Sequence, residues 1–301
     1  MISAPKFSII IPVADYNAEL KRFLLSLAAQ EYLKIFEIII VFNGQKINKY
    51  ELMRVSKLLV PITKQSKVRL IEYSKVKGAS PAWCYGIKNA KGKYVCLLAS
   101  DTTLHPEWSR SIIKRVDDSA DFYIGNYYGS LRKDHISNVE SWIDKDRFNY
   151  KIIDFRNFIV NRNKITNLLR TRFKNKWFSD SELSIMGRKG ILTRNENISR
   201  KALRDTIILN DYPNTIIKAS IRKFKHGVGV GRIKKGFYIA KDFITPLHSM
   251  FQMNLLAVGS QLTSAEKLLF VYLNSVFTFG IICGYLMPKP LVERIYKFHF
   301  D

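Results

Sequence analysis

Two short apolar segments near the start of the chain constrain its fold most strongly. Residues 7–13 (FSIIIPV) and 36–42 (FEIIIVF) are apolar almost throughout, which is typical of strands buried on both faces of a sheet. Between them, residues 17–30 place leucine and phenylalanine at helical spacing behind a suitable N-cap, Asn17. This order predicts two parallel strands joined by a right-handed helical crossover.

The same alternation continues to about residue 125. We predict further strands at 67–73 and 93–99, with a short helix at 81–90 before the latter. The pattern therefore predicts an α/β fold with a mostly parallel, twisted sheet and helices on both faces.

The ligand-binding site is expected at one edge of this sheet. Ligands of parallel α/β sheets bind beyond the carboxyl ends of the strands. Those ends correspond to residues 12–17, 43–45 and 99–103, which carry small, amide and carboxylate side chains.

Positive charge is concentrated in the second half of the chain. The whole chain has 49 Lys and Arg against 25 Asp and Glu, a formal net charge of +24. Residues 151–241 alone hold roughly 22 basic and 6 acidic side chains. Such an excess predicts an anionic partner, which can be nucleic acid, anionic lipid or a phosphorylated substrate. Residues 131–180, which are polar, basic and aromatic, predict less regular structure.

An apolar run near the C-terminus predicts membrane association. Residues 268–287 include no charged side chain and are flanked by Lys267 and Lys289. The run is long enough to span a bilayer. A helix that is apolar all round can also lie in the membrane interface or in a protein core, and the sequence leaves these alternatives open.

The cysteines and the N-terminus favour a cytoplasmic location. Cys84, Cys96 and Cys283 are too few and too scattered for a disulfide framework or a zinc site. Residues 1–6 lead directly into the first strand, and we expect no signal peptide there.

Three stretches together resemble the family 2 glycosyltransferases, an inverting group with the GT-A fold. They are the two apolar strands with their turn (7–13 and 36–44), GASPAWCYGIKNAKGKY (78–94), and FSDSEL (178–183) followed by Arg188 and Gly190. The resemblance covers roughly residues 6–235 and rests on the order and spacing of the motifs. It implies a membrane-associated enzyme that builds polysaccharide or lipid-linked glycan.

Each acidic motif of the family is reduced here to one carboxylate. The family ends its fourth strand with Asp-x-Asp, where this chain has Ala99-Ser100-Asp101. The family's acidic pair is Ser179-Asp180 here, and Asn43 replaces the aspartate of the second-strand turn. After the first proline, either Ala14-Asp15 fills the family's Tyr-Asn positions or a two-residue insertion precedes Tyr16-Asn17.

The resemblance implies a role for each retained group. Transfer from a nucleotide sugar needs a cation beside the leaving diphosphate and a base for the acceptor hydroxyl. Asp101 would hold Mg²⁺ or Mn²⁺, and Ser100 would add a hydroxyl to the metal or the ribose. Asp180 is the candidate base, Glu182 the alternate carboxylate, and Arg188 a partner of the diphosphate or the base.

The nucleotide-sugar site would draw on all the strand ends and one glycine. Its candidate residues are Pro12, Ala14, Asp15, Asn43, Gly78, Ser100 and Asp101. Structural roles compete with these assignments, because aspartate and asparagine also start helices and form turns. Asp101 can serve as a turn or N-cap residue before Pro106, and Asp180 can start a helix.

A glycine-rich basic segment is expected beside the site. Residues 221–235 (IRKFKHGVGVGRIKK) are similar to a Tyr/His-Gly-x-Gly segment of the family and predict a flexible cationic loop that binds phosphate. His226 is a candidate for the metal shell, and a surface role is the alternative. His105 is assigned a structural role.

These observations predict a three-part organisation. A nucleotide-sugar-binding half at 1–125 would be followed by an acceptor-facing, catalytic-base half at 126–235 and a membrane-associating helical segment at 236–301. The predicted partners are a nucleotide-sugar donor, a lipid-linked or glycan acceptor and an anionic membrane surface at its cytoplasmic face.

Two alternatives belong to other functional classes. A catalytically silent, glycosyltransferase-like scaffold would account for the reduced acidic motifs. A basic nucleic-acid-binding protein would account for the charge and its interleaved aromatic residues. Nucleic acid is not among the predicted partners, because no recognisable binding module is present and the apolar run at 268–287 has no role there. The sequence does not define the oligomeric state.

Overall fold

The chain forms two compact units. The computed structural model describes residues 5–43, 48–73, 79–130, 134–149, 157–171, 199–210, 212, 215–235 and 262–286. One unit consists of Met1–Tyr128 and Asp144–Asp211, and the other of Gly129–Ile143 and Tyr212–Asp301.

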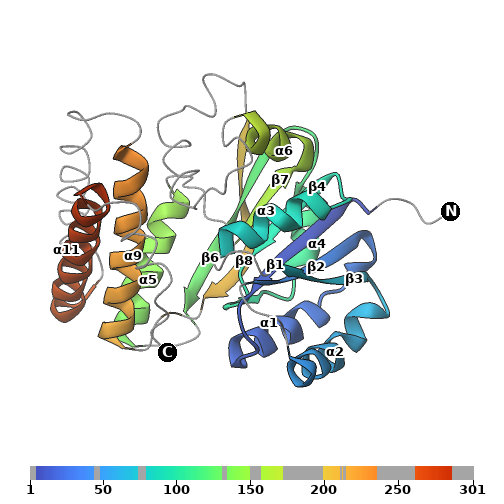
Figure 1. Ribbon diagram of the computed structural model, residues 1–301, viewed down its shortest axis with the longest axis horizontal. Coiled ribbons are helices and arrows are strands. Elements are labelled where there is room, and N and C mark those ends of the chain that lie inside the picture. The colour runs from blue at the N-terminus through green and yellow to red at the C-terminus, as the bar shows by residue number, and fades with distance from the viewer. Residues whose placement is uncertain are drawn as a thin grey trace. The chain divides into compact units, whose positions relative to one another are not determined.

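The first unit is built on one mixed sheet (Figure 1). Its eight described strands follow the spatial order β3-β2-β1-β4-β7-β6-β8-β5. Their bounds are β1 Phe7–Val13, β2 Phe36–Asn43, β3 Lys67–Tyr73, β4 Tyr94–Leu98, β5 Thr102–Leu104, β6 Phe122–Ser130, β7 Asn157–Asn161 and β8 Arg200–Asn210.

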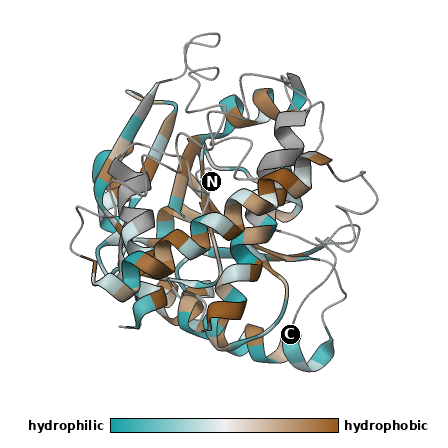
Figure 2. Cartoon of the chain, turned by 90° about the vertical axis from the view of Figure 1, so that its left-hand side faces the viewer, coloured by the Kyte–Doolittle hydropathy of each residue, from teal (hydrophilic) through white to brown (hydrophobic). Residues whose placement is uncertain are grey.

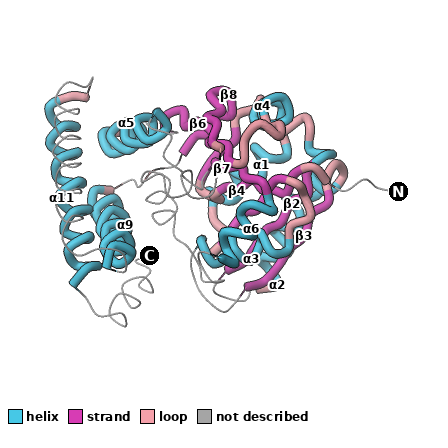
Figure 3. The backbone as a smooth tube through the Cα atoms, turned by 90° about the horizontal axis from the view of Figure 1, so that it is seen from above, coloured by secondary structure: helices cyan, strands magenta, loops and turns pink. Residues whose placement is uncertain are grey.

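Helices cover both faces of this sheet. They are α1 Ala18–Ala28, the 3₁₀ turn η1 Leu33–Ile35, α2 Lys49–Thr63, α3 Ala79–Asn89, α4 Trp108–Arg115 and α6 Arg162–Thr171. Figure 3 shows α1 and α4 on one face and α3 and α6 on the other. The α/β class predicted from the strand–helix alternation is confirmed.

The two halves of the sheet differ in strand direction. β1 pairs in parallel with β2 and with β4, and β2 pairs in parallel with β3. β7 is antiparallel to both β4 and β6, and β5 is antiparallel to β8. The parallel half matches the prediction. Within residues 131–180 the prediction of less regular structure was wrong, because α5 (His135–Asn149), β7 and α6 occupy the described parts.

A buried glutamate fastens the amino-terminal edge of the parallel strands. Glu37 of β2 is 1% exposed and accepts hydrogen bonds from Ser8 Oγ at 2.6 Å and from the backbone N–H of Gly92 at 3.2 Å. The backbone N–H of Lys91 also donates to Glu37, and Arg69 of β3 forms an ion pair with it at 2.9 Å. One carboxylate thus joins three strands to the turn that begins β4.

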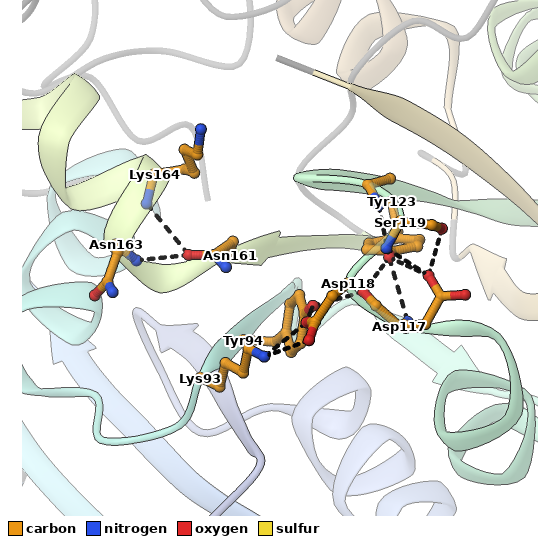
Figure 4. Close-up of polar contacts among 10 residues, drawn as sticks. Lys93, Tyr94, Asp117, Asp118, Ser119, Tyr123, Asn161, Asn163 and Lys164 are labelled. Atoms are coloured by element: carbon orange, nitrogen blue, oxygen red, sulfur yellow. Dashed lines mark hydrogen bonds and ion pairs between the residues drawn. The ribbon is translucent and has the colours of Figure 1, made fainter. Parts of the chain in front are cut away.

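More carboxylates surround the same end of β4 (Figure 4). Asp118 lies 2.7 Å from Lys93 Nζ and accepts a 2.6 Å hydrogen bond from the buried Tyr94. Asp117 accepts from the hydroxyls of Ser119 and Tyr123. These bonds lower the pKa of both carboxyls, with Lys93 as the main cause at Asp118 and Ser119 at Asp117.

The described part of the second unit consists of packed helices, namely most of α5, α9 (Ile216–Lys235) and α11 (Ser264–Leu286). Trp142 of α5 meets Phe270 of α11 edge to face, at a centroid distance of 5.2 Å. Lys223 of α9 and Glu140 of α5 form a buried ion pair at 2.8 Å.

Residues 221–235 form part of α9, so the prediction of a flexible cationic loop was wrong. Gly227, one of the glycines that suggested a loop, serves helix packing instead. A Cβ on Gly227 would overlap the carbonyl oxygen of Phe277, and one on Gly284 would overlap that of Val228. Glycine removes the side chain where two helix backbones approach most closely.

Candidate functional site

Three parallel strands end together at the expected edge of the sheet. Ile10 of β1 is level with Ile39 of β2 and with Leu97 of β4. Three residues further on, the end of β1 is therefore flanked by the end of β2 on one side and by the turn after β4 on the other.

The predicted residues of the first two strand ends lie on this edge. Pro12 is within β1, and Ala14 and Asp15 follow it as exposed loop residues. Asn43 is the last residue of β2 and is 5% exposed. Asn17 is not part of this edge chemistry, because its side chain caps α1 by accepting from the Leu20 N–H at 2.8 Å.

Asp101 occupies the turn between β4 and β5 and is half-buried. Its Oδ1 atom is fully buried and has no hydrogen-bond partner among the described residues. The alternative role as an N-cap is excluded, since α4 begins at Trp108 with Glu107 as its N-cap. A buried carboxylate oxygen without a donor is costly unless a cation or another donor occupies the space beside it.

Two residues that the sequence analysis did not select hold this turn. The indole N–H of Trp83, on α3, donates to the Leu98 carbonyl at 3.2 Å, at the last residue of β4. Thr102 Oγ1 donates to the Ala99 carbonyl at 2.8 Å, and its backbone begins the pairing of β5 with β8. The turn that carries Ser100 and Asp101 is therefore anchored at both ends.

Asn157 is a further missed residue, paired across the sheet with Leu98. It is fully buried, donates to the Thr206 carbonyl at 2.8 Å and accepts from the Trp108 indole at 3.1 Å. A Cβ on Gly125 would overlap its amide, so the glycine makes room for it. A single polar residue at the start of an apolar strand (NFIV) was the available sequence signal.

Part of the predicted site lies outside the described residues. Gly78, Asp180, Glu182 and Arg188 belong to this part, so their positions relative to Asp101 stay predictions. His226 is within α9, and its side chain is not described. His105 has a structural setting, because its carbonyl accepts from Gln30 and its Nδ1 from the Glu107 N–H.

The chemistry of the described edge suits a hard divalent cation. No three His, Cys, Asp or Glu side chains form a metal-binding group within the described ranges. Mg²⁺ and Mn²⁺ need fewer protein ligands when phosphate oxygens and water complete their shell. The orphan Oδ1 of Asp101 and the adjacent Ser100 hydroxyl fit this requirement.

Comparison with known families decides the identity of the fold. The sequence model of glycosyl transferase family 2 matches residues 8–182, which include both strand-end motifs and the segment around Asp180. The chain belongs to glycosyl transferase family 2. The matched region takes in the parallel half of the sheet apart from Phe7, the first residue of β1.

Two sequence relatives each match 40% of this family 2 chain. Glycosyltransferase GlyG of Streptococcus pneumoniae serotype 4 is 28% identical over 122 residues, covering 40% of this chain and 38% of GlyG. An uncharacterized glycosyltransferase of Rickettsia conorii, RC0461, is 34% identical over 123 residues, or 40% of this chain and 19% of the relative. The match therefore spans less than half the length of either relative.

Solved structures confirm the GT-A fold of this family 2 member. The mannosyltransferase PcManGT of Pyrobaculum calidifontis, solved with GDP-Man and Mn²⁺, has a TM-score of 0.64 at 13% identity, covering 95% of this chain and 88% of that chain. S. aureus TarS (residues 1–349) gives 0.50 at 15% identity, covering 97% and 87%.

Proposed function

We propose that the chain is an inverting glycosyltransferase that moves a sugar from a nucleotide-sugar donor to a hydroxyl of a lipid-linked or polysaccharide acceptor. Family membership and the GT-A fold support sugar transfer as the reaction class. The observation that carries the assignment of the site is the buried, unpartnered Oδ1 of Asp101 at the edge shared with Asp15 and Asn43. We place the enzyme at the cytoplasmic face of a membrane.

In this proposal the described residues bind and orient the donor. Asp101, with Ser100, would hold Mg²⁺ or Mn²⁺, which would neutralise the diphosphate as it leaves. Ala14, Asp15 and Asn43 would contact the nucleoside from the neighbouring strand ends. Trp83 and Thr102 would keep Asp101 in place, because their hydrogen bonds fix the turn on either side of it.

Asp180 is proposed as the base, with Glu182 as its alternate and Arg188 as a partner of the diphosphate. The base would remove the acceptor proton as the acceptor oxygen bonds to the anomeric carbon. The bond from that carbon to the phosphate oxygen breaks at the same time, so the anomeric configuration inverts. The nucleoside diphosphate leaves with the bonding electron pair.

Donor binding tests the site without an acceptor. Nucleotide sugars can be screened by thermal shift, with and without Mn²⁺. A donor that binds should raise the melting temperature of the protein, because binding stabilises the folded state by mass action. The rise should be lost in Asp101→Asn and kept in Asp118→Asn, which changes the same residue type at the opposite edge. A metal-dependent shift that survives in Asp101→Asn would contradict the assignment.

Turnover distinguishes an enzyme from a silent scaffold. With a donor identified by the screen, release of nucleoside diphosphate in the presence of a polyprenyl-diphosphate-linked sugar, whose hydroxyls can act as acceptors, should depend on Asp101 and on Asp180. Donor binding without turnover on any lipid or glycan acceptor would favour the scaffold.

A further inference from the structure

The outer face of α11 is uncharged and mostly apolar from Leu268 to Leu286. Leu268 is 73% exposed, Phe279 60% and Leu286 67%. Tyr272 and Ser275 complete the same face, because residues spaced three, four or seven apart lie on one side of a helix. We call these five residues the α11 stripe. None of them is charged.

The helix has the length and composition of a membrane span. Ser264–Gly284 has a mean hydropathy of 1.6, and only 28% of its most apolar window is buried in the protein. Figure 2, which faces the α5, α9 and α11 helices, shows hydrophobic residues recurring along them. Length alone does not separate a spanning helix from one that lies in the membrane surface.

The contacts of helix α9 with α11 distinguish a spanning helix from one that lies in the membrane surface. α9 runs parallel to α11 and in contact with it, because Ser220 bonds the Tyr272 hydroxyl at 3.1 Å and Phe224 packs on Phe279. Further along, Gly284 approaches the backbone of Val228. An α11 that crossed the bilayer would therefore carry this part of α9 to the same depth.

The same part of α9 is cationic. Lys218 is exposed, and Arg222 and Lys225 are half-exposed. Their spacing places them on roughly the opposite side of α9 from Ser220, Phe224 and Val228, which meet α11. Charged side chains near the bilayer centre are costly. A spanning arrangement is therefore disfavoured.

We propose that α9 and α11 form an amphipathic helix pair that lies flat on an anionic bilayer, with the α11 stripe inserted at the boundary between headgroups and acyl chains. In this arrangement the α11 stripe enters the bilayer, while the cationic side chains of α9 stay outside its hydrocarbon core. The net charge of +24 favours an anionic lipid surface and disfavours a second copy of the chain as the occupant. The inference rests on the proposed membrane location and defines how the protein attaches.

Vesicle flotation tests the attachment surface. The full chain should float with vesicles of phosphatidylglycerol and phosphatidylcholine, and more weakly with phosphatidylcholine alone. The double variant Leu268→Glu/Leu286→Glu should bind at least about 100-fold more weakly, because two large apolar side chains that are mostly exposed in the structure are lost from the membrane. Leu25→Glu on α1, at a side chain 52% exposed, is the matched control and should float normally.

Two results of the flotation experiment would overturn the proposal. One is a wild-type chain that stays in solution, and the other is a double variant that floats as well as the control. A fall in particle mass of the double variant without lipid would show that the α11 stripe is a contact between copies instead. The donor-induced thermal shift, measured on the same proteins, reports the sugar-nucleotide site separately, so loss of one does not imply loss of the other.

Label depth decides between a flat and a spanning α11. Environment-sensitive labels on cysteines at Leu268, Ser275 and Leu286, in a Cys283→Ser background, should report one shallow depth. A spanning helix would separate the outer two labels by about 27 Å along the membrane normal. A deep label at position 275 between two shallow ones would overturn the flat arrangement.

Discussion

The two edges of the parallel strands use the same acidic residue type in opposite ways. At the amino-terminal edge, Glu37, Asp117 and Asp118 each accept hydrogen bonds from several donors, so their charge stabilises the fold. At the carboxyl-terminal edge, Asp101 keeps one buried oxygen without a donor among the described residues. The difference indicates that satisfied carboxylates hold the sheet together and the unsatisfied one is available to a ligand.

Removal of the Glu37 carboxylate should produce the largest effect on the amino-terminal edge. We expect Glu37→Ala to lower the free energy of unfolding by about 3–5 kcal/mol, because Arg69 and the Gly92 N–H lose their buried partner. Chemical denaturation would measure this loss. The variant should still show a donor-induced thermal shift at temperatures where it is folded, and stability equal to wild type would contradict the structural role.

Asp101→Asn should produce the opposite result at the carboxyl-terminal edge. We expect transferase activity to fall about 100- to 1000-fold, because the charge that holds the cation is lost. The free energy of unfolding should stay the same or rise, since a buried charged oxygen without a donor is removed. Activity assays and denaturation on the same preparation measure both effects. Loss of stability and activity together would place Asp101 with the structural carboxylates.

Trp83→Phe should weaken the site without removing it. The substitution deletes the hydrogen bond to the Leu98 carbonyl and keeps an aromatic ring on α3. The turn that carries Asp101 would lose about 1 kcal/mol of support. We expect the Mn²⁺ concentration for half-maximal activity to rise several-fold, with a smaller change in kcat. Trp142→Phe makes the same chemical change in the second unit and should leave the metal dependence as in wild type.

The parallel half of the fold and its ligand edge were predictable because local signals specify them. β1 and β2 are continuous apolar runs, and a parallel sheet brings their ends together with the turn after β4. The antiparallel half was not predictable, because the pairing of β7 with β4 and β6 depends on contacts between distant segments. Helix α9 was missed for a related reason. Its glycines predict a loop when they are considered alone, and the close approach of the α11 backbone to Gly227 becomes visible only in the fold.

The hydrogen bonds that hold the turn of Asp101 could not be predicted from the sequence either. The roles of Trp83 and Thr102 depend on which carbonyl groups the fold brings within reach of their side chains. Whether a carboxylate is satisfied depends on such partners. The sequence therefore predicted where acidic residues lie but not which of them the fold would use.

Acid should lower the stability that the amino-terminal edge contributes, and we expect this to be the smallest of the predicted effects. Lys93 and, secondarily, Tyr94 hold the pKa of Asp118 below its ordinary value of 3.8. A depressed folded-state pKa contributes stability above the ordinary pKa, and that stability is lost as the pH falls toward the folded-state value. The free energy of unfolding should therefore decrease between about pH 5 and pH 3, less steeply in Asp118→Asn and in Lys93→Met than in wild type. Urea denaturation at several pH values measures these slopes. Equal slopes in all three proteins would show that the Asp118 contacts in Figure 4 contribute nothing to stability, and the contrast between the edges would then rest on Glu37 and Asp117 alone.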